Sequence, residues 1–265
     1  MKLVDSHCHL DDRRFADDLE AVVERAQAAG VEFLVSIGTG EGPPDLEAGL
    51  RMAERFACVF ATVGIHPHDA SKSNDDALKK LEALARLPKV VAIGEIGLDY
   101  HYDNSPREVQ LDVFGAQMDI AARAGKPIVI HTREAWGDTF SALERHWQPE
   151  RGGIMHCFSG GAPEGARSVA LGFHLSFAGI LTYSNSEGLQ DAARAVPAHR
   201  MLVETDAPYL APVPYRGRVK RNEPAFVVET AKKLAELRGE TLEFVAQTTS
   251  QNWHDLVGAS LRGVA

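Results

Sequence analysis

Short runs of β-branched and other apolar residues recur along the chain, and each run ends in polar residues or glycine. Between them lie segments whose apolar residues recur every three or four positions, as in Leu19, Val22, Val23 and Ala26. This spacing is typical of a helix that buries one face. The pattern predicts strands that alternate with helices. The predicted strands are residues 2–4, 33–37, 59–63, 90–93, 127–130, 153–155, 174–177 and 201–203.

One helix has clear boundary signals. Ser105, Pro106 and Glu108 predict its start, with Ser105 as the N-cap and Pro106 at the first helical position. Gly125 predicts its end, because glycine adopts the left-handed conformation that closes many helices.

Eight alternations of strand and helix favour an α/β fold of the (β/α)8 TIM-barrel type. The 265 residues fit a single domain, residues 1–265, because such barrels typically contain about 250 residues. An open, doubly wound sheet is the alternative. Its dinucleotide-binding fingerprint is missing from the glycine-rich stretches 38–42 and 160–165, which makes that fold the weaker prediction.

Composition adds expectations about the environment of the protein. Hydrophobic residues make up 45% and charged residues 25% of the chain, as in soluble globular proteins. No apolar run approaches the roughly 20 residues of a membrane helix, and the N-terminus lacks a long apolar secretory region. Three cysteines without paired spacing argue against a disulfide framework. We therefore expect a cytoplasmic protein without membrane contact.

The strongest chemical signal is a set of histidines and carboxylates at strand ends. His7 and His9 have the same parity in the first strand, so an extended backbone directs both imidazoles to one side and Cys8 to the other. Glu95, His131, His156 and Asp206 each close another apolar run. In barrel enzymes the active site lies at the carboxyl ends of the strands, so these residues are expected to converge.

Four histidines and two carboxylates suit one or two divalent cations. Imidazole and carboxylate ligands are compatible with Mg²⁺, Mn²⁺, Zn²⁺, Ni²⁺ or iron, and the sequence does not select among them. Two cations can activate water near neutral pH and polarise a phosphoryl oxygen. The pattern therefore predicts a metal-dependent hydrolase.

Six motifs at these positions resemble the TatD family of metal-dependent deoxyribonucleases, in the amidohydrolase-like superfamily, and the resemblance runs nearly end to end. The motifs are DSHCHL at 5–10, GIHPH at 64–68, GEIGLDY at 94–100, HCFSG at 156–160, ETDAPY at 204–209 and RGRVKRNEP at 216–224.

This resemblance implies a first metal held by His7, His9 and Asp206. Glu95 would bridge to a second metal, which His131 and His156 would hold. The implied reaction is 3′–5′ exonuclease cleavage of single-stranded DNA, with DNA repair as a physiological role. Glu95 and Asp206 are the expected catalytic residues, and our hypothesis is that Asp206 accepts or relays the proton of the attacking water.

Substrate contacts are expected from His66, Arg133, Arg216 and Arg218. The formal net charge of −9 repels polyanions, so a nucleic-acid partner needs a local basic segment such as 216–221. No obligate protein partner is indicated.

Two other functions stay open at this point. One is a related hydrolase of small esters, lactones or amides, which the basic segment disfavours. The other is a metal-binding barrel without turnover, which the complete ligand set disfavours.

Overall fold

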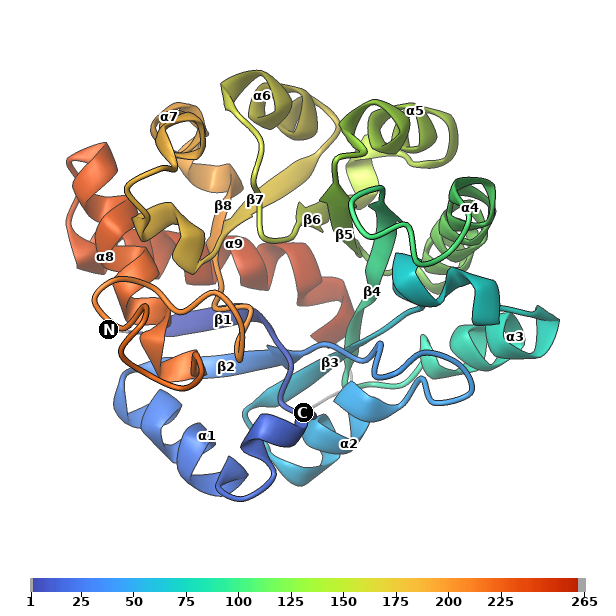
Figure 1. Ribbon diagram of the computed structural model, residues 1–265, viewed down its shortest axis with the longest axis horizontal. Coiled ribbons are helices and arrows are strands. Elements are labelled where there is room, and N and C mark those ends of the chain that lie inside the picture. Colours follow the sequence, from blue (N-terminus) through green and yellow to red (C-terminus); the bar gives the residue numbers. More distant parts are fainter. Residues whose placement is uncertain (1, 262–265) are drawn as a thin grey trace. The chain divides into compact units, whose positions relative to one another are not determined.

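A computed structural model describes residues 2–261 of the chain, and Figure 1 traces its alternation of strands and helices. The chain divides into two compact units. Unit 1 consists of the described residues within Met1–Ser36, His156–Val169 and His174–Asp255, and unit 2 of those within Ile37–Met155, Ala170–Phe173 and Leu256–Ala265.

In unit 1, β1 (Leu3–Cys8) pairs in parallel with β2 (Val31–Ser36), and β7 (Phe173–Phe177) pairs in parallel with β8 (Met201–Val203). A parallel bridge joins Cys8 to Ala207, just beyond β8. The ends of the first and last strands therefore run side by side.

In unit 2, β3 (Val59–Val63), β4 (Val90–Asp99), β5 (Ile128–Arg133) and β6 (Gly153–Met155) pair in parallel, each with the next. The eight strands follow one another in chain order from β1 to β8 in one sheet. Together with the bridge between the first and last strand ends, this order confirms the predicted (β/α)8 barrel.

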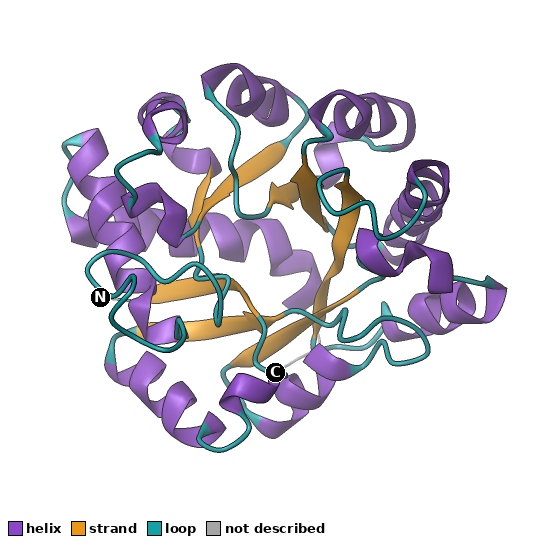
Figure 2. Ribbon diagram, in the orientation of Figure 1, coloured by secondary structure: helices purple, strands orange, loops and turns teal. Residues whose placement is uncertain are grey.

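The helices alternate with the strands along the chain, and Figure 2 draws helices in purple and strands in orange. They are α1 (Leu19–Ala28), α2 (Ala48–Arg55), α3 (Asp75–Leu84), α4 (Arg107–Ala124), α5 (Trp136–His146), α6 (Ala162–Ala170), α7 (Glu187–Ala195), α8 (Val227–Arg238) and α9 (Leu242–Leu261).

The predicted strand ends differ from the observed ones mainly where polar residues lie within the strands. β3, β6 and β8 have the predicted bounds. β1, β4 and β5 continue to Cys8, Asp99 and Arg133, beyond the first polar residue. β4 is buried at every position, Glu95 and Asp99 included, so burial of functional side chains hides the strand end from a hydrophobic pattern.

The predicted start of α4 is wrong by one residue, because Pro106 is the N-cap and the helix begins at Arg107. Ser105 does not cap the helix. Its Oγ donates to the carbonyl of His68 at 3.0 Å and accepts from the N–H of Ser71 at 3.0 Å, so it anchors the 3-10 helix Pro67–Lys72. Gly125 ends α4 in the left-handed conformation, as predicted.

Two buried glutamines of α4 hold strand ends of unit 2. The Gln117 amide accepts from the N–H of Ile65 at 2.7 Å and donates to its carbonyl at 3.0 Å. The Gln110 amide bonds the backbone of Asp99 in the same two-way manner, at 2.8 and 3.1 Å. These contacts fix the chain just after β3, at the residue before His66, and at the end of β4, four residues after Glu95.

Gln117→Leu is expected to lower the free energy of unfolding by about 2–4 kcal/mol, because it leaves the buried N–H and C=O of Ile65 without partners. Urea unfolding monitored by circular dichroism measures the effect. Gln27→Leu, at an exposed position of α1, is the matched control and is expected to change stability by less than about 0.5 kcal/mol. Equal effects of both changes would contradict this role of Gln117.

Candidate metal centre

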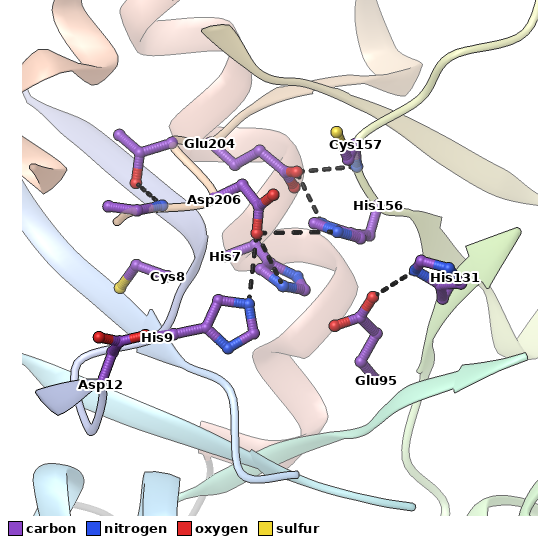
Figure 3. A network of polar contacts seen from close by, with 12 residues as sticks. His7, Cys8, His9, Asp12, Glu95, His131, His156, Cys157, Glu204 and Asp206 are labelled. Atoms are coloured by element: carbon purple, nitrogen blue, oxygen red, sulfur yellow. Dashed lines mark hydrogen bonds and ion pairs between the residues drawn. The ribbon is translucent and has the colours of Figure 1, made fainter. Parts of the chain in front are cut away.

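In unit 1, three imidazoles surround the carboxylate of Asp206, as Figure 3 shows. The Oδ1 atom of Asp206 lies 3.8 Å from Nε2 of His7, 3.3 Å from Nε2 of His9 and 4.0 Å from Nε2 of His156. The rings of His7 and His156 stack with their centres 3.4 Å apart. We call these four residues the aspartate cluster.

The donor atoms of the aspartate cluster have the spacing of ligands that share a cation. Two ligand atoms that each lie about 2.1 Å from a tetrahedral metal ion are roughly 3.4 Å apart. The distances of 3.3–4.0 Å fit this spacing. His7, His156 and Asp206 also each offer a ligand atom within 4.8 Å of the others. The residues therefore fit a divalent cation.

Glu204 orients His156 from behind. Its Oε1 atom lies 2.7 Å from Nδ1 of His156 and accepts the backbone N–H of Cys157 at 2.8 Å. The carboxylate is fully buried, and among the described residues its Oε2 atom has no hydrogen-bond partner. A carboxylate at Nδ1 leaves Nε2 to face a metal, which is how proteins commonly orient a histidine ligand.

The backbone at two of these positions is strained. Cys157 and Asp206 have φ angles of 41° and 53°, in the left-handed region that side-chain-bearing residues seldom adopt. The turn after β8 is held by Asp5, which accepts from the N–H of Thr205 at 2.9 Å and from its hydroxyl at 2.5 Å. Such strain gathers at functional sites, where surrounding contacts enforce it.

The pKa values of Asp5 and Asp206 are shifted in opposite directions. Burial raises the pKa of Asp5 to about 8, even though hydrogen bonds from Thr205 favour its charged form. Burial also acts to raise the pKa of Asp206, but the hydrogen bond with His9 and the charges of His156, His9 and His7 outweigh it and lower the pKa. Asp206 is therefore the aspartate suited to remain ionised as a ligand or proton acceptor.

In unit 2, a second cluster surrounds Glu95. Its Oε1 atom lies 2.7 Å from Nδ1 of His131 and 3.6 Å from Nε2 of His66. His66, Glu95 and His131 each offer a ligand atom within 4.8 Å of the others. We call these three residues the glutamate cluster. His66, expected only as a substrate contact, is thus placed where it can also bind a metal.

Asp99 supports the glutamate cluster, a role that the sequence reasoning missed. Its Oδ2 atom lies 3.1 Å from Nε2 of His131 and 2.9 Å from Nε2 of His68. Burial acts to raise its pKa, but hydrogen bonds from His131, the Tyr102 backbone and His68 together hold the pKa well below its usual range. Its position in β4, four residues after Glu95 and with the same parity, was the available signal.

The pKa of His66 is lowered to about 4 because burial disfavours its charged form, against the opposing charge of Glu95. The imidazole is therefore neutral near pH 7 and able to bind a cation.

Gly97 lets β4 and β5 approach closely at this point. Its φ is 138°, and a Cβ atom there would lie 2.0 Å from the carbonyl oxygen of His131. A side chain at this position would force the backbone of β4 or of β5, which carries His131, to shift.

The expected substrate-contact arginines have different surroundings. Arg133 is the last residue of β5 rather than a loop residue, and its guanidinium lies 4.8 Å from the ring centre of Tyr102. Arg216 lies 3.7 Å from the ring centre of Tyr183, and Arg218 is exposed.

Arg221 and Asn222 of the 216–224 motif make structural contacts. Arg221 pairs with Asp18 at 2.6 Å and with Glu223 at 3.0 Å, so its charge is already neutralised. Asn222 is buried and donates to the carbonyl of Thr205 at 2.8 Å. Asn222 therefore holds the turn that carries Asp206.

Among the described residues, no helix has both the length and the apolar character that crossing a membrane requires.

The chain is similar to known proteins of one family. Residues 4–258 match the family described as TatD related DNase. The chain is 40% identical over 250 residues to the uncharacterized metal-dependent hydrolase YabD of Bacillus subtilis, covering 94% of this chain and 96% of that protein. It is 35% identical over 266 residues to the 3′-5′ ssDNA/RNA exonuclease TatD of Klebsiella pneumoniae, covering 99% and 100%.

Among solved structures, the TatD homologue YJJV of Escherichia coli K12 superposes with a TM-score of 0.88 at 31% identity, covering 97% of this chain and 98% of that one. An organophosphorus hydrolase of Deinococcus radiodurans shares the fold at 18% identity and a TM-score of 0.65. The motifs, the fold and these relatives agree, and the chain belongs to the TatD family of metal-dependent hydrolases.

Proposed function

We propose that the protein is a phosphodiester hydrolase that removes nucleotides from the 3′ end of single-stranded DNA. The observation that carries the proposal is the 35% identity, across 99% of the chain, to a protein named as a 3′-5′ exonuclease on single-stranded DNA and RNA. The two clusters supply the residue types that such a reaction needs.

We assign His7, His9, Glu95, His131, His156 and Asp206 as ligands of two divalent cations per chain. Each residue stands near or just beyond the carboxyl end of a strand of the parallel sheet, apart from Glu95 and His131, which lie within β4 and β5, and barrel enzymes carry their active sites at that end. When bound, divalent cations supply positive charge that activates water and stabilises the charge developing on a phosphoryl group.

Asp206 is the proposed proton acceptor. Its lowered pKa keeps the carboxylate ionised near neutral pH, so it can take a proton from the attacking water. Glu204 and Asp99 act on the histidines instead, because their oxygens lie 2.7 and 3.1 Å from ring nitrogens of His156 and His131. His66 is neutral near pH 7 and serves either as a further ligand or as a substrate contact.

Arg133, Arg216 and Arg218 are the proposed phosphate contacts. The net charge of −9 means that positive charge must be local if the protein is to hold a polyanion. Arg218 is exposed, and Arg216 is held against Tyr183 beyond β8, in the segment that leads away from Asp206.

With 5′-labelled single-stranded DNA, metal-free protein is expected to be inactive. Added Mg²⁺, Mn²⁺ or Zn²⁺ should produce a ladder that shortens from the 3′ end, and Glu95→Ala should show no ladder, which excludes a contaminating nuclease. If folded, metal-loaded protein cleaves no oligonucleotide with any of these metals but hydrolyses small esters or lactones with multiple turnover, the small-molecule alternative is correct. If it turns over neither, the protein only binds metal.

Asp206→Asn is expected to lower kcat by roughly 10²–10⁴-fold, because the amide keeps a ligand oxygen but cannot accept the proton. Metal content, measured by elemental analysis, shows whether the cation is retained. Asp191→Asn, at an exposed position of α7, is the control and should leave kcat unchanged. Near-normal turnover of Asp206→Asn with normal metal content would rule out the proton-acceptor role.

Removing Arg216 and Arg218 is expected to weaken DNA binding several-fold and to flatten its salt dependence. Each lost phosphate contact on a single strand lowers the slope of log K against log salt by about 0.7. Fluorescence anisotropy between 50 and 200 mM salt, roughly the range over which such contacts are screened, measures the slope. Arg194→Ala, an exposed arginine of α7 paired with Asp191, is the control. An unchanged slope would exclude these arginines from the binding surface.

A further inference from the structure

We propose that Tyr209 is the stacking platform for the base of a nucleotide held at the aspartate cluster, and that Arg14 is a positioning residue that fixes the Tyr209 ring. This inference rests on the proposed nuclease function and gives a structural reason for a preference for strands whose end bases are unpaired.

Tyr209 is tied to two of the proposed ligands. It follows Asp206 by three residues, and its backbone N–H donates to the carbonyl of Asp206 at 2.8 Å. Its ring meets the imidazole of His9 edge-on, with the ring centres 5.8 Å apart and the planes at 84°. The distance from the ring to the aspartate cluster is therefore fixed by both backbone and side-chain contacts.

The side chain of Tyr209 is partly open to solvent. Tyr209 keeps 46% of its surface exposed, although Arg14 lies over its ring and the His9 imidazole stands nearly perpendicular to it. In contrast, His7 of the aspartate cluster is fully buried. An exposed aromatic side chain thus lies beside the proposed ligands, and every nucleobase presents a face that can stack on an aromatic ring.

Arg14 holds the ring rather than contacting phosphate. Its guanidinium carbon lies 4.3 Å from the ring centre of Tyr209, within the range of a cation–π contact. The same guanidinium donates two hydrogen bonds to Asp12, at 2.9 and 2.7 Å. Asp12 both neutralises the charge of Arg14 and fixes its plane, which leaves Arg14 poorly suited to bind a free phosphate and well suited to support the ring.

This arrangement selects unpaired ends. A base inside a duplex is already stacked and paired on its own strand, and it has to leave the helix before it can reach a protein ring. A base at a single-stranded end pays little of that cost. Stacking on an aromatic side chain strengthens binding by roughly 5- to 150-fold per base. The platform therefore favours single-stranded over blunt double-stranded ends.

The test combines changes in Tyr209 with removal of a base from the substrate. Single-stranded hexamers of thymidine carry one abasic residue at the last, second-last or third-last position from the 3′ end, and an unmodified hexamer serves as reference. Binding is measured by fluorescence anisotropy in a Glu95→Gln background with Mg²⁺ present, and KM and kcat are measured with active protein. Phe244→Ala removes an exposed aromatic of α9 and is the matched control.

We expect the parent protein to bind one of the abasic hexamers roughly 5- to 150-fold more weakly than the reference. Tyr209→Ala should bind the reference that much more weakly, with no further loss on the abasic strand, because both changes remove the same contact. KM should rise while kcat changes little. Tyr209→Phe should restore binding, Tyr209→Leu should not, and Arg14→Lys should fall between them because lysine lacks the planar fork that pairs with Asp12.

Equal binding of intact and abasic strands by the parent protein would contradict the proposal that Tyr209 stacks on a base. So would a Tyr209→Ala protein that still binds the intact strand more tightly than the abasic strand. In either case continued cleavage of the reference strand would leave the nuclease function standing. If the parent protein neither binds nor cleaves any of the hexamers, the proposed function fails and the platform fails with it.

Discussion

The Asp206 carboxylate lies among three imidazoles, and the surrounding contacts of unit 1 hold these four side chains together. Asp206 and His7 are both buried or nearly so, and placing a carboxylate among imidazoles without a cation would favour their protonation. A divalent cation would offset the charge of Asp206 and bind imidazole nitrogens beside it, in the spacing that the structure shows. The strained turn at Asp206, the support of Glu204 behind His156 and the buried bonds of Asp5 and Asn222 all maintain that spacing.

The glutamate cluster follows the same design with other residues. Asp99 stands behind His131 as Glu204 stands behind His156, and in each case a buried carboxylate sets the ring orientation. Gly97 and Gln110 fix the backbone from which Glu95 and Asp99 project. Folding stability and metal chemistry therefore share the same contacts, so a change that loosens the strand ends is expected to impair both.

Much of this organisation could be predicted from the sequence, for physical reasons. The alternation of strands and helices followed from hydrophobic spacing, and three strands have the predicted bounds. The strand ends at Cys8 and Asp99 were missed because buried polar residues look like loop residues in a hydrophobic pattern, and the end at Arg133 was missed because the last three residues of β5 are polar. Ser105 looked like a helix cap, but its hydroxyl bonds the segment after His66 instead, a tertiary contact that local spacing does not encode. The contacts of Arg14 with Tyr209, of Arg221 with Asp18 and of Asp99 with His131 also join residues that lie far apart in the sequence. Only the folded chain reveals them.

Anomalous X-ray diffraction from crystals soaked in Mn²⁺ shows whether the aspartate cluster holds a cation that the reaction requires. We expect an anomalous peak within about 2.0–2.3 Å of Asp206, His7 and His9, in protein that is active with Mn²⁺ in solution. A protein that hydrolyses DNA with Mn²⁺ but shows no peak at Asp206, or shows one only at other residues, would contradict it.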